Sequence, residues 1–323
     1  MKSAILVMLV GAAIAAPGAR ALGAEPDAPA CTVSVGPDQS IQAAIDAAPE
    51  GAVICLKGLW QESLTITKDL TLRAAAPDGA SINGGLEGGR PVILVVSEKE
   101  IEVRLVGLTV AVAGGLNDTH YYEDGVRVEG RAKIVIEDCT ILGNTCDGVH
   151  LEDQAQAVIE SSRIFSNEES GISAMDSTQV TVIDSRLAGN RGAGVVLGGA
   201  ARGEIRGCSL QWNWMGGIVV AESATAAIEA CRLQGNGKWG VILGDTAQAT
   251  LIGNTIVGHE LYGVALTDPP CFEDGATFLG YVAGHGNVIP GPADPDGNGV
   301  GAVCPEELSF LATETGGTLD RRK

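Results

Sequence analysis

This sequence is poor in aromatic and basic residues. Phe, Trp and Tyr make up 4% of its 323 residues, and 21 Lys and Arg stand against 40 Asp and Glu, a net charge of −19. So acidic a chain offers no basic surface to nucleic acid or to anionic membranes, and we expect neither as a partner. Because 45% of the residues are hydrophobic and only 19% are charged, a disordered acidic tail is also excluded.

Long hydrophobic runs are absent after the N-terminus. The first residues combine a basic start at Lys2, an apolar stretch over Ala4–Ala16 and the small-residue pattern Ala19-Arg20-Ala21, as a secretory signal peptide does. The stretch is too short for a permanent membrane span, and the alternative is a buried N-terminal helix. We therefore expect residues 1–24 to be a signal peptide, the rest to lack a membrane span, and the location to be secreted or periplasmic.

None of the eight cysteines forms a CxxC pair, which argues against a zinc ribbon or a thioredoxin motif. In an exported chain these thiols are open to oxidation. Cys31 and Cys55 flank the first predicted ordered segment, and Cys271 and Cys304 flank the last. We predict these two pairs as disulfides at the two ends of the fold.

Glycine is plentiful instead, and it recurs with a fixed period. The chain has 45 Gly, about twice the usual share of roughly 7%. Five of its ten Asn lie 23 residues apart, the next step falls on His259, and a Gly follows four residues after each of these positions. The pairs are Asn144/Gly148, Asn167/Gly171, Asn190/Gly194, Asn213/Gly217, Asn236/Gly240 and His259/Gly263. Columns in one register identify an internal repeat.

Each repeat contains three short strands separated by turns. In the repeat that begins at Ile134 they span Ile134–Glu137, Thr140–Leu142 and Gly148–Glu152. Such short strands cannot pair within one repeat, so each must hydrogen-bond to its equivalent in the next repeat, roughly 4.8 Å away. Helical solenoids with roughly 33 to 47 residues per repeat are excluded because no helix fits beside three strands.

A column of small residues occupies the tight turn after the first strand of each repeat. A small side chain there can hydrogen-bond to the backbone of the neighbouring repeat. For Cys208 and Cys231 we favour packed thiols; a disulfide between the two is strained by their parallel Cβ vectors, and a metal site is the third alternative. The column consists of Cys139, Ser162, Ser185, Cys208, Cys231 and Asn254.

These columns resemble the right-handed parallel β-helix repeats of the pectin-lyase-like superfamily. Gln39–Gly51 is similar to the N-terminal capping helix that opens many such chains, pectin methylesterases in particular. The resemblance implies an all-β, single-stranded right-handed parallel β-helix over residues 25–267, with regular 23-residue rungs over 125–267. The repeat stops at Asp268, and we expect an irregular C-terminal cap and tail over 268–323. The superfamily holds lyases, hydrolases, esterases, epimerases and non-enzymatic proteins, so the fold does not determine the chemistry.

The resemblance places family sites on the outer side of the strand that follows the periodic glycine. Because side chains alternate along a strand, the outward residues can be read from the sequence. Two rungs present charged pairs, Arg127 with Glu129 and His150 with Glu152. Later rungs present an apolar stripe, which we expect a loop, a tail or a protein partner to cover. The stripe is Val196, Val219 and Ile242.

An insertion of eight residues, Asn117 to Asp124, is expected to overhang the charged end. Aromatic rings beside charged groups suit the stacking of sugars. We predict three catalytic residues: Arg127, Asp147 and His150. The predicted substrate-binding residues are Tyr121, Tyr122, Asp124, Glu129 and Glu152. The alternative interpretation is a solvated charged end with a decorated loop.

No enzyme of the superfamily fits closely. Asn144–Gly148 resembles a broken form of the polygalacturonase Asn-Thr-Asp-Gly motif, but the paired Asp one rung later is replaced by Glu168-Glu169-Ser170. A calcium-dependent lyase could use Asp124 and Asp147 with Arg127, and an acidic protein needs calcium to bridge it to a polyuronate. We therefore prefer polysaccharide binding. A polysaccharide lyase or glycoside hydrolase with its site near the charged end is the first alternative, and a non-enzymatic surface scaffold is the second.

The C-terminal region contains one motif typical of calcium loops. Asp294, Asp296 and Asn298 place oxygen atoms at alternate positions before a Gly, and the pattern resembles thrombospondin type-3 repeats and EF-hands. The twelfth position, however, holds Pro305 rather than an acid. Calcium is the one cofactor that the sequence suggests, and a turn-rich cap held by a disulfide is the favoured alternative.

Overall fold

The computed structural model describes residues 30–322, apart from residues 78, 85–88, 112–122 and 273–276. The segment assigned to a signal peptide, residues 1–24, lies outside the described residues. The chain divides into two compact units, Met1–Ala30 and Cys31–Lys323, and all described helices and strands belong to the second. Among the described residues, no helix combines the length and the apolar character that crossing a membrane requires.

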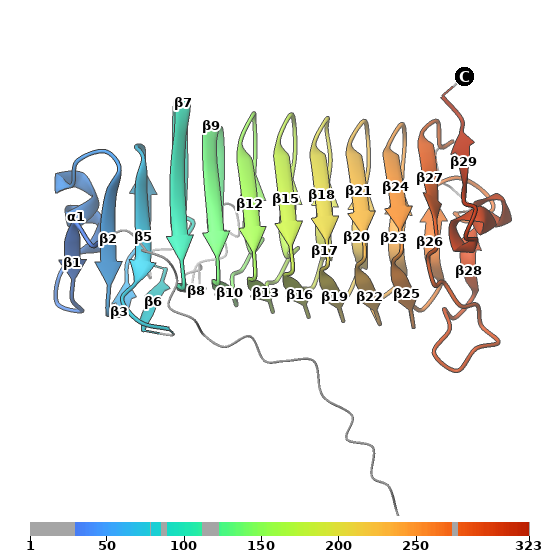
Figure 1. Cartoon of the computed structure of the whole chain (residues 1–323), viewed down its shortest axis with the longest axis horizontal. Coiled ribbons are helices and arrows are strands. Elements are labelled where there is room, and N and C mark those ends of the chain that lie inside the picture. The colour runs from blue at the N-terminus through green and yellow to red at the C-terminus, as the bar shows by residue number, and fades with distance from the viewer. Residues whose placement is uncertain (1–29, 78, 85–88, 112–122, 273–276, 323) are drawn as a thin grey trace, which may run out of the picture. The chain divides into compact units, whose positions relative to one another are not determined.

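Residues 31–323 wind into a coil whose strands stack in three rows (Figure 1). We call each turn of the coil a rung. The front row, which follows the periodic glycine, contains β4 (Leu64–Ile66), β7 (Ile93–Val106), β9 (Val126–Glu137), β11 (Val149–Leu151), β14 (Ile172–Ala174), β17 (Ala193–Leu197), β20 (Gly216–Val220), β23 (Trp239–Leu243), β26 (Tyr262–Leu266) and β28 (Gly301–Cys304).

The long strands β7 and β9 continue into the side row, where β7 pairs with β5 and β9 with β12. The side row also contains β1 (Val33–Val35), β2 (Ala52–Leu56), β5 (Leu70–Ala74), β12 (Gln156–Glu160), β15 (Gln179–Ile183), β18 (Arg202–Arg206), β21 (Thr225–Glu229), β24 (Gln248–Ile252), β27 (Tyr281–His285) and β29 (Gly317–Asp320). The short row is β3 (Gly58–Gln61), β6 (Ala80–Asn83), β8 (Thr109–Ala111), β10 (Thr140–Leu142), β13 (Arg163–Phe165), β16 (Arg186–Ala188), β19 (Ser209–Gln211), β22 (Arg232–Gln234) and β25 (Thr255–Val257).

Like positions on successive rungs pair with one another throughout the regular part. In the side row Ile159 pairs in parallel with Val182, and in the short row Ile141 pairs with Ile164. Both pairs are separated by one 23-residue repeat. The predicted parallel coil is therefore confirmed, and the predicted strand Thr140–Leu142 is observed with the same bounds.

The interior of the coil is filled by the aliphatic columns. Ile141, Ile164 and Leu187 are fully buried on three successive rungs. Complete burial of such a side chain contributes about 1.5 to 3 kcal/mol relative to exposure. Because each rung adds only a thin aliphatic layer, the core needs few aromatic rings, which explains the scarcity of aromatic residues in the sequence.

An asparagine ladder runs along the turn between the short row and the front row. Asn167 Oδ1 accepts hydrogen bonds from the main-chain N–H and the Nδ2 amide of Asn144, at 3.1 and 2.8 Å. The same two bonds connect the later members of the column, Asn167 to Asn190, Asn190 to Asn213 and Asn213 to Asn236. The ladder thus satisfies buried polar groups along the length of the regular part.

The periodic glycines are required by the close approach of neighbouring rungs. A Cβ atom on Gly171 would lie 2.7 Å from Gly194 O and 2.9 Å from Asn190 Nδ2. The periodic glycines from Gly148 to Gly263 do not have positive φ angles. Space, rather than backbone conformation, therefore explains this column.

The small residues of the tight turn form a second ladder. Ser162 Oγ accepts a hydrogen bond from Cys139 N at 3.1 Å. Cys208 and Cys231 are buried free thiols, and Cys231 Sγ donates to Ile205 O at 3.4 Å. The favoured prediction of packed thiols is confirmed.

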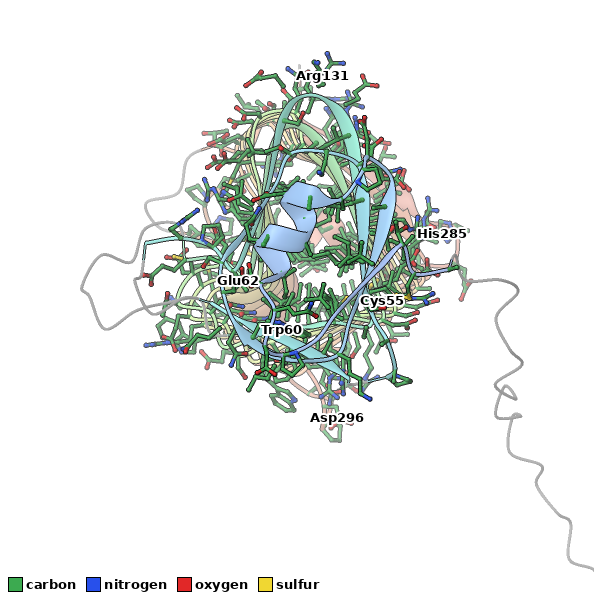
Figure 2. All side chains as sticks on the ribbon, turned by 90° about the vertical axis from the view of Figure 1, so that its left-hand side faces the viewer. Cys55, Trp60, Glu62, Arg131, His285 and Asp296 are labelled. Atoms are coloured by element: carbon green, nitrogen blue, oxygen red, sulfur yellow. A yellow bond between two sulfur atoms is a disulfide. The ribbon has the colours of Figure 1, made fainter. Side chains whose placement is uncertain are left out.

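The N-terminal end is closed by α1 (Ile41–Ala47), inside the segment predicted to be a capping helix. Its Ile41 and Ile45 side chains are buried. Figure 2 shows this helix lying across the end of the coil. The predicted disulfide Cys31–Cys55 is present at this end.

The coil continues for one more rung after the regular repeat stops at Asp268. Asn254 N donates to Asn287 Oδ1 at 2.9 Å, and His259 N donates to Asn298 Oδ1 at 3.2 Å, so both ladders gain a further member. The separations are 33 and 39 residues instead of 23. Insertions between the strands therefore hide the last rung, formed with β27 and β28, from a search for a fixed period.

The C-terminal residues then close the coil. The 3₁₀ helix η1 (Glu306–Ala312) buries Leu308 and Leu311, and β29 pairs antiparallel with β27. The predicted disulfide Cys271–Cys304 is present. The expected tail is in part wrong, because residues 317–320 form an ordered strand.

The calcium loop expected at residues 294–298 is not formed as predicted. Asp294 and Asp296 are exposed, whereas Asn298 is fully buried. Asn298 Oδ1 accepts from His259 N, and its Nδ2 donates to Ile256 O and Pro290 O. The side chain of Asn298 thus belongs to the asparagine ladder, and its oxygen already has a partner.

We expect Asn190→Ala to lower the free energy of unfolding by about 2 to 4 kcal/mol. The substitution removes hydrogen bonds to two neighbouring rungs and leaves buried polar groups unpaired, at about 1 to 3 kcal/mol each. Gln179→Ala, at an exposed position of β15, is the control and should stay within about 0.5 kcal/mol of the parent. Urea unfolding measures both; equal midpoints for the two variants would contradict a stabilising role of the ladder.

Candidate active site

The charged residues of the front row lie next to one another on adjacent strands. Arg127 on β9 pairs in register with His150 on β11, and His150 pairs with Ser173 on β14. Glu129 and Glu152 follow two positions later and therefore point to the same side of the sheet. The structure thus brings together the outward residues that alternation predicts.

Arg127 is the centre of this cluster, and its side chain is only 5% exposed. Its Nη1 lies 3.0 Å from Asp124, its Nε 2.6 Å from Glu129 and its Nη2 2.6 Å from Glu152. Burial by itself lowers the pKa of Arg127, but the hydrogen bonds to Glu129 and Asp124 raise it above its ordinary value. The guanidinium therefore stays charged, and it needs these carboxylates because an unpaired buried charge is strongly destabilising.

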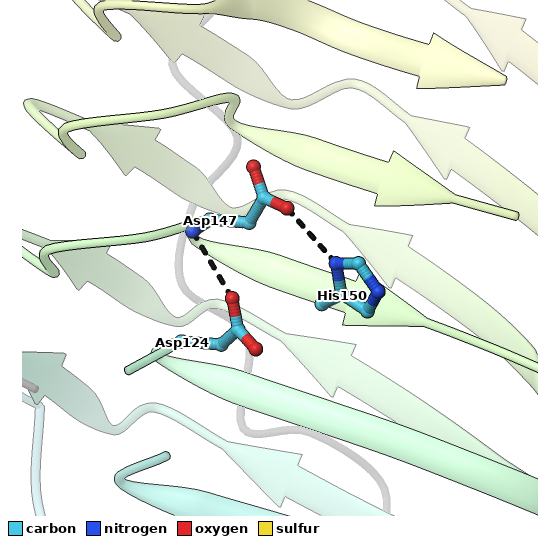
Figure 3. Close-up of side chains that lie close together, drawn as sticks. All are labelled: Asp124, Asp147 and His150. Carbon is cyan, nitrogen blue, oxygen red and sulfur yellow. Dashed lines mark hydrogen bonds and ion pairs between the residues drawn. The ribbon is translucent and has the colours of Figure 1, made fainter. Parts of the chain in front are cut away.

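His150 lies between two carboxylates. Its Nδ1 lies 2.9 Å from Asp147 Oδ2 (Figure 3), and its Nε2 lies 3.1 Å from Glu152 Oε1. Burial lowers the pKa of His150, but the hydrogen bond to Asp147 and the charge of Asp124 outweigh burial and raise the pKa above its ordinary value. The site therefore favours the protonated imidazole, which can donate from both nitrogens.

Asp124 and Asp147 connect the cluster to the backbone of the following rungs. Asp124 Oδ1 accepts from Asp147 N at 3.1 Å, and Asp147 Oδ1 accepts from Ser170 N at 2.7 Å (Figure 3 shows the first bond). Burial raises the pKa of Asp124 despite the opposing charge of His150. Both aspartates are thus fixed in position by the same stacking that forms the coil.

The glutamates at the edge of the cluster differ in acidity. Burial raises the pKa of Glu152, but Arg127 outweighs burial and holds the pKa below its usual range. Burial and the charge of Asp147 raise the pKa of Glu169. The site therefore contains carboxyl groups whose proton affinities are pushed apart, an arrangement found where acids and bases act in catalysis.

Sequence reasoning missed Glu123. Its carboxylate is fully buried, accepts from Gly89 N at 2.7 Å, and is hydrogen-bonded to the Thr145 hydroxyl. Its place beside Asp124 in an acidic run was the available signal. The predicted sugar-stacking residues Tyr121 and Tyr122 lie outside the described residues.

A divalent cation does not fit the cluster as it is arranged. Asp124, Asp147 and His150 each offer an atom, and these atoms lie within 4.8 Å of one another. However, the four oxygens of the two aspartates already have N–H partners from Asp147, Ser170, Arg127 and His150. The positive charge that a cation would bring is supplied by Arg127 and His150.

The apolar stripe of the front row is covered in part by the chain itself. Ile242 is 7% exposed, whereas Val196 and Val219 remain half-buried. The segment with Phe272 lies against this end, because its ring centroid is 5.1 Å from that of Trp239, which begins β23. A protein partner remains a prediction for the rungs at Val196 and Val219.

The chain was compared with known families and structures. A family model described as right handed beta helix region matches residues 117–273. No curated protein sequence matches the chain.

Several solved structures share the fold. An alginate lyase from Paenibacillus sp. str. FPU-7 is 17% identical with a TM-score of 0.58, over 84% of this chain and 99% of that one. The periplasmic alginate epimerase AlgG is 12% identical with a TM-score of 0.53, over 84% and 80%. ORF18 of Geobacillus virus E2 is 13% identical with a TM-score of 0.52, over 76% and 56%. The chain is therefore a right-handed parallel β-helix repeat protein with the fold of the pectin-lyase-like superfamily.

Proposed function

We propose that this protein binds and processes a polysaccharide on its front row, with proton transfer at His150. The observation that carries the proposal is the imidazole held between Asp147 and Glu152, beside the buried Arg127. A charged cluster on the outer side of a sheet is costly to desolvate, and residues with shifted pKa values gather at sites of acid–base chemistry. Two structures that share the fold are, by name, an alginate lyase and an alginate epimerase.

Each residue of the cluster has a part in this proposal. His150 donates its Nε2 proton to an oxygen of the sugar chain, for which Glu152 at the more exposed edge moves aside. Asp147 fixes the ring through Nδ1 and keeps it protonated. Arg127 is a positioning residue that holds Glu129 and Glu152. General acid catalysis of this kind contributes about 10² to 10⁴ in rate.

The charge of the cluster bears on the substrate. Asp124, Glu129, Asp147 and Glu152 outnumber the two cations Arg127 and His150. The cluster therefore favours a neutral polysaccharide over a polyuronate.

Binding without chemistry is the second candidate function. It is favoured by the closed set of contacts in the cluster, where Arg127 and both nitrogens of His150 already have protein partners. Such a rigid surface can recognise a sugar through water-mediated and edge contacts without transferring a proton. Export to the periplasm or the medium belongs to both proposals, and the two disulfides support it because they persist in oxidising compartments.

We expect purified protein to release product from one member of a panel of neutral and acidic polysaccharides, and His150→Gln to lose about 10² or more of that rate. Reducing ends and unsaturated products measure hydrolysis and elimination respectively. Arg163→Gln, on the short row, is the control and should keep full rate. Retention on one glycan column without product would select the binding function, and neither retention nor product would overturn both.

The contribution of His150 to stability should depend on pH. Because its pKa is raised in the folded state, its ion pairs stabilise the fold below the unfolded value of about 6.5, and this contribution is lost as the pH rises through the folded value. The parent should therefore exceed His150→Gln in urea midpoint at about pH 6, and the difference should shrink toward about pH 9. His259, whose pKa burial lowers to about 4, titrates alike in both proteins. A difference that grows with pH would contradict the charged imidazole.

Chelators should leave the cluster intact. Because the oxygens of Asp124 and Asp147 already have N–H partners, we expect EDTA and added calcium to leave the thermal midpoint and the glycan activity unchanged. Differential scanning calorimetry with and without each reagent tests this. A calcium-dependent rise in midpoint that disappears in Asp147→Asn would show that a cation does enter the cluster.

A further inference from the structure

A groove lies on the short row, outside the charged cluster. It has a volume of about 390 Å³ and extends over three rungs. It is lined by Arg163 and Phe165 of β13, Arg186 and Ala188 of β16, Gly189 and Trp212. We call it the short-row groove.

Trp212 forms one wall of the groove from a position that favours glycine. Its φ angle is 58°, a left-handed conformation that bulky residues rarely adopt. The other members of this column with left-handed φ are Gly143, Ser166, Gly189, Gly235 and Gly258. The Trp212 side chain is 60% exposed. Neither the turn nor the core therefore requires a tryptophan here, and backbone strain of this kind is typical of functional positions.

The next rung fixes the orientation of the indole. A Cβ atom on Gly235 would lie 2.4 Å from the ring carbon Cζ3 of Trp212, so the ring packs against Gly235. Its other face is directed toward the groove, whose floor is formed by the small residues Ala188 and Gly189. Phe165 lies on the opposite wall, two rungs away, at a backbone separation of roughly 9.6 Å. This spacing accommodates a single ring between the aromatic walls.

Two arginines give the groove a positive charge. Arg163 Nη2 donates to Thr140 Oγ1 at 3.1 Å, and Arg186 Nη2 donates to Gln211 Oε1 at 3.4 Å. Within the part of the chain that the structure describes, neither arginine forms an ion pair, whereas Arg191 does. Each guanidinium has five N–H donors, so most of them remain for a ligand. Unpaired arginines side by side are unexpected in a chain of net charge −19.

We propose that the short-row groove is a second, non-catalytic binding site for an acidic saccharide. The apolar face of one sugar ring stacks on Trp212, and Arg163 and Arg186 bind its carboxylate or sulfate group. Aromatic faces suit the stacking of flat apolar surfaces, and guanidinium groups bind planar anions through paired hydrogen bonds. This site goes beyond the function proposed for the front row, because it shares no residue with the Arg127 cluster.

The test is a calorimetric titration of the full protein with three hexasaccharides. The probes are a mannuronate hexamer, a sulfated heparin-derived hexamer and neutral cellohexaose. We expect an acidic hexamer to bind and cellohexaose to bind at least about tenfold more weakly, and the tighter acidic probe identifies the anion. Equal binding of cellohexaose, or no binding of either acidic probe, would overturn the proposal.

Variants then locate the binding site. Trp212→Gly places in this column the residue that its turn prefers, so it removes the ring without loss of stability, which thermal unfolding verifies. We expect this variant and the double variant Arg163→Gln/Arg186→Gln each to weaken binding of the acidic probe by about tenfold or more. Trp214→Ala and Arg232→Gln are matched controls, since Trp214 is 75% exposed and neither residue lines the groove. Both controls should bind like the parent.

His150→Gln separates this site from the front row. It should bind the acidic hexamer with the affinity of the parent, because His150 does not line the groove. If binding is lost in His150→Gln but kept in Trp212→Gly, the saccharide binds at the front row and the groove proposal fails. If His150→Gln loses only product formation, both sites stand.

Discussion

The structure depends on backbone hydrogen bonds between like positions on successive rungs. In the regular part this places every residue against its counterpart one repeat along the chain, as Ile159 against Val182. A polar side chain in the interior therefore meets another side chain of the same kind, and asparagine suits this arrangement because its amide carries both a donor and an acceptor. Each Asn oxygen accepts from the preceding rung while the Asn nitrogen donates to the next. The coil can thus bury a polar column without unpaired groups, and it can hold buried thiols at Cys208 and Cys231 as free members of a ladder.

The same stacking turns the outer face of each row into a set of columns, and the two proposed sites lie where a column changes its residue type. In the front row Arg127 is preceded by Leu94 and followed by His150 in register. A guanidinium on this surface is stable only because Asp124, Glu129 and Glu152 surround it. On the short row the change is from glycine to Trp212, and the adjoining glycines leave the space that becomes a groove. Repetition builds the scaffold, and departures from repetition create the recesses and the charges.

Much of the fold could be predicted from the sequence because the period of 23 residues appears in several columns at once. Alternation along short strands also identified Arg127 and His150 as neighbours on one face. The last rung could not be predicted, because insertions displace Asn298 from the period and a local Asp-rich pattern then imitated a calcium loop. The short-row groove was also missed. Its residues come from three rungs and from a turn, and the sequence does not reveal that the indole of Trp212 packs on Gly235.

Charge explains why an acidic sugar chain would bind at the short row rather than at the front row. The protein repels polyanions as a whole at −19, so a polyanion can be held only where positive charge is local and uncompensated. At the front row both cations are already compensated, Arg127 by three carboxylates and His150 by two. Arg163 and Arg186 instead have neutral partners, Thr140 and Gln211. Two arginines on adjacent rungs, roughly 4.8 Å apart along the coil, also match the spacing of one sugar unit in an extended chain more closely than a single cation could. The short row therefore provides the charge that the front row lacks, on the same rigid coil.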